Sequence, residues 1–167
     1  LVVIAVTTGS GKSWLAERLR TPLTAIRIRS DVERKRIAGL CPLATSGGTI
    51  YTPDLTTRTY DRLNDAARQI ISAGFTAVID AACLLETERA QLRATAAQMG
   101  VPFSLLWVHA PRDLLLRRIA ARQAAANDPS EATATVLESQ LRFAEKPDAT
   151  ELSHGLCIDS SAEIDVA

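Results

Sequence analysis

The chain alternates between short apolar runs rich in β-branched residues and longer segments whose apolar residues recur every three or four positions. The first pattern is typical of strands buried on both faces, and the second is typical of amphipathic helices. Strands that alternate with helices form a parallel sheet that helices cover on both faces. The expected strands are residues 2–6, 25–28, 76–79, 103–108 and 156–158.

Helical periodicity fills the segments between these strands. The longest helix is expected at residues 55–73, where Gly74 ends it, and another is expected at 111–126 because proline is favoured in a first turn. The sequence Asp128-Pro129-Ser130-Glu131 has the composition of a helix start, so a further helix is expected from there to about residue 143. The other expected helices are residues 12–20, 31–38 and 86–99.

Length and composition limit the possible classes of protein. The 167 residues are enough for one domain, residues 1–167, with a single sizeable core. Basic and acidic residues number 19 each, so net charge favours neither nucleic acid nor a membrane surface as a partner. No signal peptide and no apolar run of membrane-spanning length is present. The chain begins at Leu1, inside the first expected strand, which is compatible with a protein fused to or cut from a larger chain.

The cysteines indicate the cellular compartment. Cys41, Cys83 and Cys157 are far apart and odd in number. They have neither the spacing of metal ligands nor that of a disulfide framework. This usage fits the reducing cytoplasm, which is the expected location.

The first expected strand runs directly into a loop that ends in Gly-Lys-Ser. Residues 6–13 match the phosphate-loop pattern Gly-x4-Gly-Lys-Ser/Thr except at its first position, which is Val6. Such a loop points several backbone N–H groups into one concavity, where the positive end of the following helix adds to the field. Lys12 would reach the β- and γ-phosphates of ATP, and the Ser13 hydroxyl would hold Mg²⁺. The expected nucleotide contacts are Thr8, Gly9, Ser10, Gly11, Lys12, Ser13 and Trp14.

Two residues depart from the phosphate-loop pattern. Valine resists positive φ, so the loop must enter through an extended residue at Val6 or turn one step later, at Thr7 or Thr8. Trp14 replaces the small hydroxyl residue that is common after the serine, which would remove a contact to the α-phosphate. A glycine-rich turn without a ligand is the alternative interpretation, and Gly-Lys-Ser directly after a buried strand argues against it.

The residues after the strands matter because ligands of parallel sheets bind beyond the carboxyl ends of the strands. Asp31 and Arg34 lie one helical turn apart after the second expected strand. Asp31 would take or orient the proton of an attacking hydroxyl, and Arg34 would neutralise the transferring phosphoryl group or hold an anionic substrate. The alternative is that Ser30 or Asp31 only caps a helix. Asp80 ends the third expected strand and is a second candidate ligand for Mg²⁺, with a turn aspartate as its alternative.

Arginines after the fourth expected strand are candidates for contacts to ATP. Arg118 and Arg122 share one helix face because they are four residues apart. The segment at about 118–130 is expected to be a small lid that closes these arginines over the phosphates and excludes water. Solvent-facing positions on the helix are the alternative for such arginines.

The irregular segment at residues 40–53 is the longest loop in the chain. Loops of that length in compact domains are often functional. It is therefore expected to cover the phosphate acceptor, and the expected substrate contacts beside it are Tyr51 and Arg58.

With these residues assembled, the chain resembles the small P-loop kinases of the AAA_33 or "predicted kinase" group. Relatives in that group include the 5′-kinase domain of polynucleotide kinase, chloramphenicol phosphotransferase, gluconate kinase and zeta toxin. The resemblance rests chiefly on TTGSGKS at residues 7–13 and RSDVERKR at 29–36. It implies a three-layer α/β P-loop fold whose five parallel strands have the order 2-3-1-4-5.

The resemblance also suggests roles for particular residues. In the polynucleotide kinase relatives, the residues that match Asp31 and Arg34 are the general base and an acceptor-site phosphate ligand. Lid arginines that match Arg118 or Arg122 clasp the ATP phosphates. With Lys12, these four residues are the expected catalytic set.

The sequence therefore predicts an ATP-dependent phosphotransferase that moves the γ-phosphate to a hydroxyl of a small molecule, with Asp31 as base and with ATP and Mg²⁺ as cofactors. Two alternatives stay open. One is a nucleotide-binding regulatory module with little turnover, suggested by Val6 and Trp14. The other is a 5′-hydroxyl polynucleotide kinase, suggested by the basic residues at 27–36, although neutral net charge and few aromatic residues argue against it.

Overall fold

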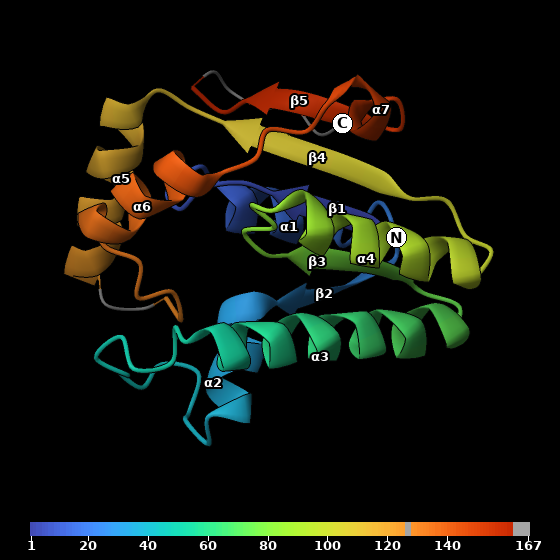
Figure 1. The fold of residues 1–167 in the computed structure, drawn as a ribbon, viewed down its shortest axis with the longest axis horizontal. Helices are drawn as coiled ribbons and strands as arrows, with labels where there is room; N and C mark the ends of the chain where they lie inside the picture. Colours follow the sequence, from blue (N-terminus) through green and yellow to red (C-terminus); the bar gives the residue numbers. More distant parts are fainter. Residues whose placement is uncertain (126–127, 162–167) are drawn as a thin grey trace.

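The computed structural model describes residues 1–125 and 128–161. Five parallel strands form one sheet in the order β2-β3-β1-β4-β5, which confirms the order implied by the sequence. β1 (Val2–Ala5) is central, between β3 (Thr76–Asp80) and β4 (Ser104–His109), while β2 (Ala25–Arg29) and β5 (Gly155–Asp159) are the edge strands. Because the strands are parallel, their carboxyl ends all lie at one side of the molecule, the left-hand side of Figure 1.

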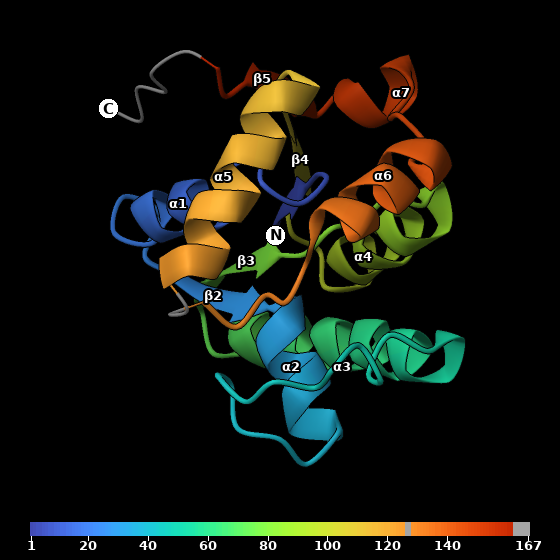
Figure 2. The ribbon, with the colours of Figure 1, turned by 90° about the vertical axis from the view of Figure 1, so that its left-hand side faces the viewer.

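Helices cover both faces of the sheet, as the alternating pattern predicts. α3 (Pro53–Ser72) and α4 (Glu86–Gln98) pack on one face, and α1 (Lys12–Leu19) packs on the other (Figure 2). Side chains of the central strand alternate between these two layers. Val3 belongs to the core under α3 and α4, and Ile4 belongs to the core under α1.

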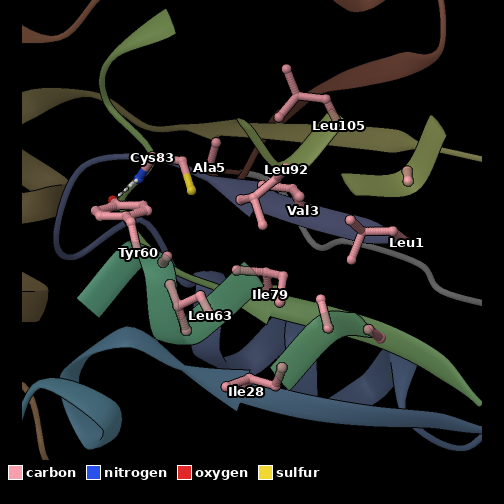
Figure 3. Packing of buried hydrophobic residues seen from close by; sticks show 14 of the residues in the cluster. Leu1, Val3, Ala5, Ile28, Tyr60, Leu63, Ile79, Cys83, Leu92 and Leu105 are labelled. Atoms are coloured by element: carbon pink, nitrogen blue, oxygen red, sulfur yellow. Dashed lines mark hydrogen bonds between the residues drawn. The ribbon is translucent and has the colours of Figure 1, made fainter. Parts of the chain in front are cut away.

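The larger core lies between the sheet and helices α3 and α4. Figure 3 shows Leu63 of α3 and Leu92 of α4 directed toward Val3 and the neighbouring strands. Fully burying an aliphatic side chain of this size stabilises the fold by about 1.5–3 kcal/mol. The same layer fixes the segment after β3, because the Tyr60 hydroxyl accepts a hydrogen bond of 3.0 Å from the backbone N–H of Cys83.

Four further helices complete the described structure. α5 (Arg112–Ala125) and α6 (Ala134–Phe143) pack against each other and lie across the carboxyl ends of the strands in Figure 2. α2 (Ser30–Ile37) follows β2 at the same end, and α7 (Ala149–Leu152) precedes β5. In the described part of the chain, no helix has both the length and the apolar character needed to cross a membrane.

The expected helix start at residues 128–131 is wrong. α6 begins at Ala134, and the side chain of Thr133 caps it by accepting a hydrogen bond from Val136. Asp128 instead accepts the backbone N–H of Ser130 at 2.8 Å, which closes a tight turn. An aspartate before a proline suits a turn as well as a helix cap, so composition alone did not separate the two. Residues 126 and 127, the end of the expected 111–126 helix and part of the expected lid, lie outside the described residues.

Candidate active site

The loop between β1 and α1 turns at its glycines. Gly9 and Gly11 have φ of +83° and +91°, whereas the buried Val6 does not have a positive φ. A Cβ atom on Gly9 would also lie only 2.8 Å from the carbonyl oxygen of Leu115 in α5. The loop therefore accommodates valine at its first position because the turn begins after Val6, at Thr8 and Gly9, and its positive-φ positions are glycines.

Lys12 and Ser13 begin α1 and lie beside the end of β3. Lys12 is 9% exposed, and within residues 1–125 and 128–161 its ammonium group forms no ion pair. The Ser13 hydroxyl donates a hydrogen bond of 2.9 Å to Oδ2 of Asp80. The other oxygen of that buried carboxylate, Oδ1, has no hydrogen-bond partner among the residues that the structure describes.

These two oxygen-bearing side chains suit a hard divalent cation. Mg²⁺ is bound through one or two protein oxygens together with phosphate and water, rather than by a cage of side chains. The unpartnered Oδ1 of Asp80 and the adjacent Ser13 hydroxyl match that requirement. Elsewhere in the described residues, histidine, cysteine and carboxylate side chains form no group that could hold a metal ion.

Arg27 and Arg29 of β2 also contact Asp80, and sequence reasoning did not single them out for this. Arg27 donates Nε to Oδ2 of Asp80 at 3.1 Å and pairs with the same oxygen through Nη2. Nε of Arg29 lies 3.5 Å from that oxygen. β2 and β3 run parallel with Arg29 opposite Asp80. The alternation Arg27, Ile28, Arg29 was the available signal, because alternate residues of a strand share a face.

Arg118 of α5 lies beside the helical end of the phosphate loop. Its Nη1 would be 3.9 Å from a Cβ atom on Gly11. It donates hydrogen bonds to the hydroxyl and the carbonyl oxygen of Ser160, at 3.0 and 2.7 Å. The guanidinium therefore links the loop after β5 to the phosphate loop.

Arg122 of α5 and Gln140 of α6 both hold Thr8, at the strand end of the phosphate loop. Arg122 donates to the Thr8 hydroxyl at 3.2 Å and to the carbonyl oxygen of Ala132 at 2.9 Å, while its buried Nε has no partner among the described residues. The backbone N–H of Thr8 donates to Oε1 of Gln140 at 2.7 Å. Gln140 was missed because its position on α6 relative to the loop depends on the packing of two distant helices.

Asp31 lies near the start of α2 and is free to interact with a ligand. The helix begins at Ser30 and its cap residue is Arg29, with no side-chain cap bond, so neither Ser30 nor Asp31 has the capping role of the alternative interpretation. No hydrogen bond engages the Asp31 carboxylate within the part of the chain that the structure describes.

Arg34 is buried and held by the end of the 40–53 loop. It donates to the Thr56 hydroxyl at 3.0 Å and to the carbonyl oxygen of Ile50 at 3.4 Å, and its guanidinium lies 5.2 Å from the centre of the Tyr51 ring. Burial and the nearby charge of Asp31 raise the pKa of Tyr51 to about 12. The phenol therefore stays protonated and available as a hydrogen-bond donor at neutral pH.

Two expected contact residues lie apart from this group. Arg58 is exposed, and its carboxylate partner is Asp54 at 3.7 Å on the outer surface of α3. Trp14 is 43% exposed and stacks with Arg18, whose guanidinium carbon lies 4.1 Å from the ring centre. Both side chains interact with neighbours one turn away on their own helices.

Glu131 joins three segments of the site. Its carboxylate accepts Nζ of the buried Lys35 at 2.9 Å and both the backbone N–H and the hydroxyl of Ser46, at 3.0 and 2.9 Å. Burial favours a raised pKa for Glu131, but the hydrogen bonds from Lys35 and Ser46 outweigh it, so the pKa is lowered. Glu131 thus ties α2 and the 40–53 loop to the segment before α6.

A central parallel strand, a glycine-turned loop and a Lys-Ser helix start define the class: this is a protein with the P-loop nucleoside-triphosphatase fold. The chain belongs to the AAA_33 family, described as an AAA domain, which matches residues 2–147. No curated protein matches the sequence.

Several solved kinases have similar structures. A gluconokinase from Sinorhizobium meliloti 1021 has a TM-score of 0.67 and 20% identity, over 97% of this chain and 83% of that chain. A sugar kinase from Janibacter sp. HTCC2649 has a TM-score of 0.73 and 21% identity, over 97% and 86%. The APS kinase of Mycobacterium tuberculosis, in complex with AMPPNP and APS, has a TM-score of 0.59 and 22% identity, over 74% and 70%. At these identities the similarity establishes the fold.

Proposed function

We propose that the protein is an ATP-dependent phosphotransferase that moves the γ-phosphate of ATP to a hydroxyl group of a small molecule. The observation that carries the proposal is that two charged groups lie at the same end of the sheet and that neither forms an ion pair within the described residues. One is the buried ammonium of Lys12 at the phosphate loop, and the other is the carboxylate of Asp31 at the start of α2. The AAA_33 family and the kinases with similar folds support the assignment.

The phosphate loop supplies the nucleotide contacts in this proposal. Backbone N–H groups from Gly9 to Lys12 surround the β-phosphate, and Lys12 adds a positive charge toward the γ-phosphate. The Ser10 hydroxyl is buried and has no hydrogen-bond partner in residues 1–125 and 128–161, which supports a ligand at the loop. Ser13 and Asp80 would hold Mg²⁺, and the bound ion would neutralise charge on the phosphates.

Transfer requires little more than positioning and charge stabilisation. Asp31 accepts the proton of the acceptor hydroxyl, and the hydroxyl oxygen of the acceptor bonds to the γ-phosphorus. The bond between that phosphorus and the β–γ bridging oxygen breaks, which releases ADP. Arg118 and Arg122 offset the negative charge on the phosphoryl oxygens. An arginine in such a position contributes roughly 10³–10⁵-fold to the rate of phosphoryl transfer.

The acceptor would bind between Asp31 and the 40–53 loop. Arg34 and the protonated Tyr51 offer donors to a polar or anionic group of the acceptor. The kinases with similar folds are named for gluconate and sugars, so polyhydroxy compounds are the first acceptors to test.

The experiment is a transfer assay with Mg·ATP and a panel of sugars, sugar acids and other small alcohols, together with an oligonucleotide that carries a 5′-hydroxyl. Lys12→Ala should abolish transfer to every acceptor. Asp31→Asn should leave ATP affinity within a few-fold of wild type and remove transfer. Wild-type turnover by the Asp31→Asn variant would overturn the base assignment.

The same assay separates the alternative functions. Tight ATP binding with no transfer to any acceptor would support a regulatory module. Transfer only to the oligonucleotide, with an affinity that falls steeply as salt rises, would support a polynucleotide kinase.

A further inference from the structure

We infer that Arg27 weakens the affinity of the site for a divalent cation, because its guanidinium and the cation compete for the carboxylate of Asp80. This inference rests on the proposed function, in which Ser13 and Asp80 are the residues that would hold Mg²⁺. It concerns the affinity for the metal and makes no use of the phosphate acceptor.

The two oxygens of Asp80 have very different surroundings. Oδ2 accepts the Ser13 hydroxyl at 2.9 Å and Arg27 Nε at 3.1 Å, and it also pairs with Arg27 Nη2. Arg29 lies 3.5 Å from the same oxygen. Oδ1 is buried and has no hydrogen-bond partner within the described part of the chain. One oxygen of the carboxylate is therefore occupied by cationic donors, while the other has an open acceptor position.

Charge determines the outcome of this arrangement. Two guanidinium groups already face the single negative charge of Asp80, which is about 1% exposed through its side chain. Charges at a buried position interact more strongly than they do in water, because the effective dielectric constant is lower there. A divalent cation that binds Asp80 beside Arg27 meets repulsion from its guanidinium, and this repulsion is relieved when Arg27 moves away from Asp80.

The structure also provides a second partner for the displaced guanidinium. Nη1 of Arg27 lies 3.2 Å from the Glu17 carboxylate of α1. Both residues line a groove of about 490 Å³ along the edge strand β2, so the Arg27 side chain has space on that side. Glu17 can hold Arg27 after the cation has taken its place at Asp80.

The test measures how Mg²⁺ changes the affinity for a fluorescent ADP analogue, which needs no catalysis. Arg27→Met should lower the half-saturating Mg²⁺ concentration by about tenfold, which is a typical size for the effect of one binding interaction on another. Arg27→Lys, which keeps the charge but loses the paired nitrogens, should fall between wild type and Arg27→Met. Arg36→Met is the matched control and should change nothing, because Arg36 lines the same groove but, within the described residues, pairs with Glu33 and contacts neither Asp80 nor Glu17.

A change at Glu17 provides an independent test with the opposite sign. Glu17→Gln removes the second partner of Arg27, so Arg27 should stay on Asp80 and the half-saturating Mg²⁺ concentration should rise. This variant keeps the proposal testable if Arg27→Met does not fold, which circular dichroism would show.

The possible failures are distinguishable. An Arg27→Met protein that is folded, binds the ADP analogue and has an unchanged or higher Mg²⁺ requirement would overturn this inference and leave the proposed function intact. A wild-type protein that binds no nucleotide at any Mg²⁺ concentration would overturn the proposed function and this inference with it.

Discussion

Gly9 is constrained twice, once by its own backbone and once by a distant helix. Its φ of +83° lies in a region that residues with a side chain rarely adopt. A Cβ atom at this position would also lie against the carbonyl oxygen of Leu115 in α5. The phosphate-loop pattern Gly-x4-Gly-Lys-Ser/Thr leaves this position open, so the motif by itself indicates neither reason. The second reason became visible only when α5 was placed against the loop.

We expect Gly9→Ala to destabilise the fold and to weaken nucleotide binding. Backbone strain at such a position costs roughly 1–3 kcal/mol, and the 2.8 Å approach to Leu115 adds to it. Gly48→Ala is a matched control, since Gly48 has φ of +82° and open space around its Cβ position. Urea unfolding should show a larger loss for Gly9→Ala than for Gly48→Ala, and equal losses would show that the contact with α5 has no cost.

Among the elements, the strands were predictable and the start of α6 was not. The inner strands β1, β3 and β4 are largely buried and are nearly continuous apolar runs, whereas the edge strands β2 and β5 are partly exposed and carry a weaker version of the same pattern. The segment 128–133 is polar, and its conformation follows from its partners. Asp128 pairs with Arg29 at 3.1 Å and Glu131 pairs with Lys35, and both partners come from residues about a hundred positions earlier.

We expect Glu131→Gln to loosen the 40–53 loop. The amide retains a hydrogen bond but loses the charge that holds Lys35 and Ser46, so the loop should open more often. Limited proteolysis should cut within residues 40–53 several times faster than in wild type. If the proposed function holds, KM for the acceptor should rise while ATP affinity changes little.

Glu138→Gln is the control for that prediction. Glu138 also lies on the α6 side of the site, but its side chain is 41% exposed and its one ion-pair partner in the described residues is Arg112, so proteolysis of the loop should not change. Equal cleavage rates in wild type and Glu131→Gln would show that the loop is held by other contacts.

On the scale of the whole molecule, a buried ion pair ties the short helix α7 to the core. Arg89 of α4 is about 1% exposed and pairs with Glu151 of α7 through hydrogen bonds of 2.7 and 2.9 Å. Arg89 also donates to the carbonyl oxygens of Cys83 and Leu84, in the segment that follows Asp80. The pair therefore connects α7 to the end of β3.

We expect this pair to make stability depend on pH in the acid range. The hydrogen bonds from Arg89 lower the pKa of Glu151 below its ordinary value of 4.5. As the pH falls, Glu151 is protonated in the unfolded chain before it is protonated in the folded protein. The ion pair therefore stabilises the folded state fully above pH 4.5, and this stabilisation is lost as the pH falls through the lower pKa of Glu151 in the folded state.

Glu151→Gln should lower the free energy of unfolding by roughly 3 kcal/mol at pH 7, the cost of breaking a buried ion pair. Urea unfolding measured at several pH values should show that the difference in unfolding free energy between Glu151→Gln and wild type becomes smaller below pH 4.5. A difference that is the same at pH 7 and at pH 3.5 would contradict the assignment of this acid dependence to Glu151.

The sequence by itself determined the parallel sheet, the strand order through the AAA_33 resemblance, and the phosphate loop, because each depends on local apolar runs or on a motif of adjacent residues. Only the tertiary structure decided that Arg27 lies on Asp80, that Gln140 holds Thr8 and that Glu131 joins Lys35 to Ser46. These contacts link residues 53, 132 and up to 96 positions apart. Such pairs form where packed helices and strands meet, and no local pattern records which side chains will face each other there.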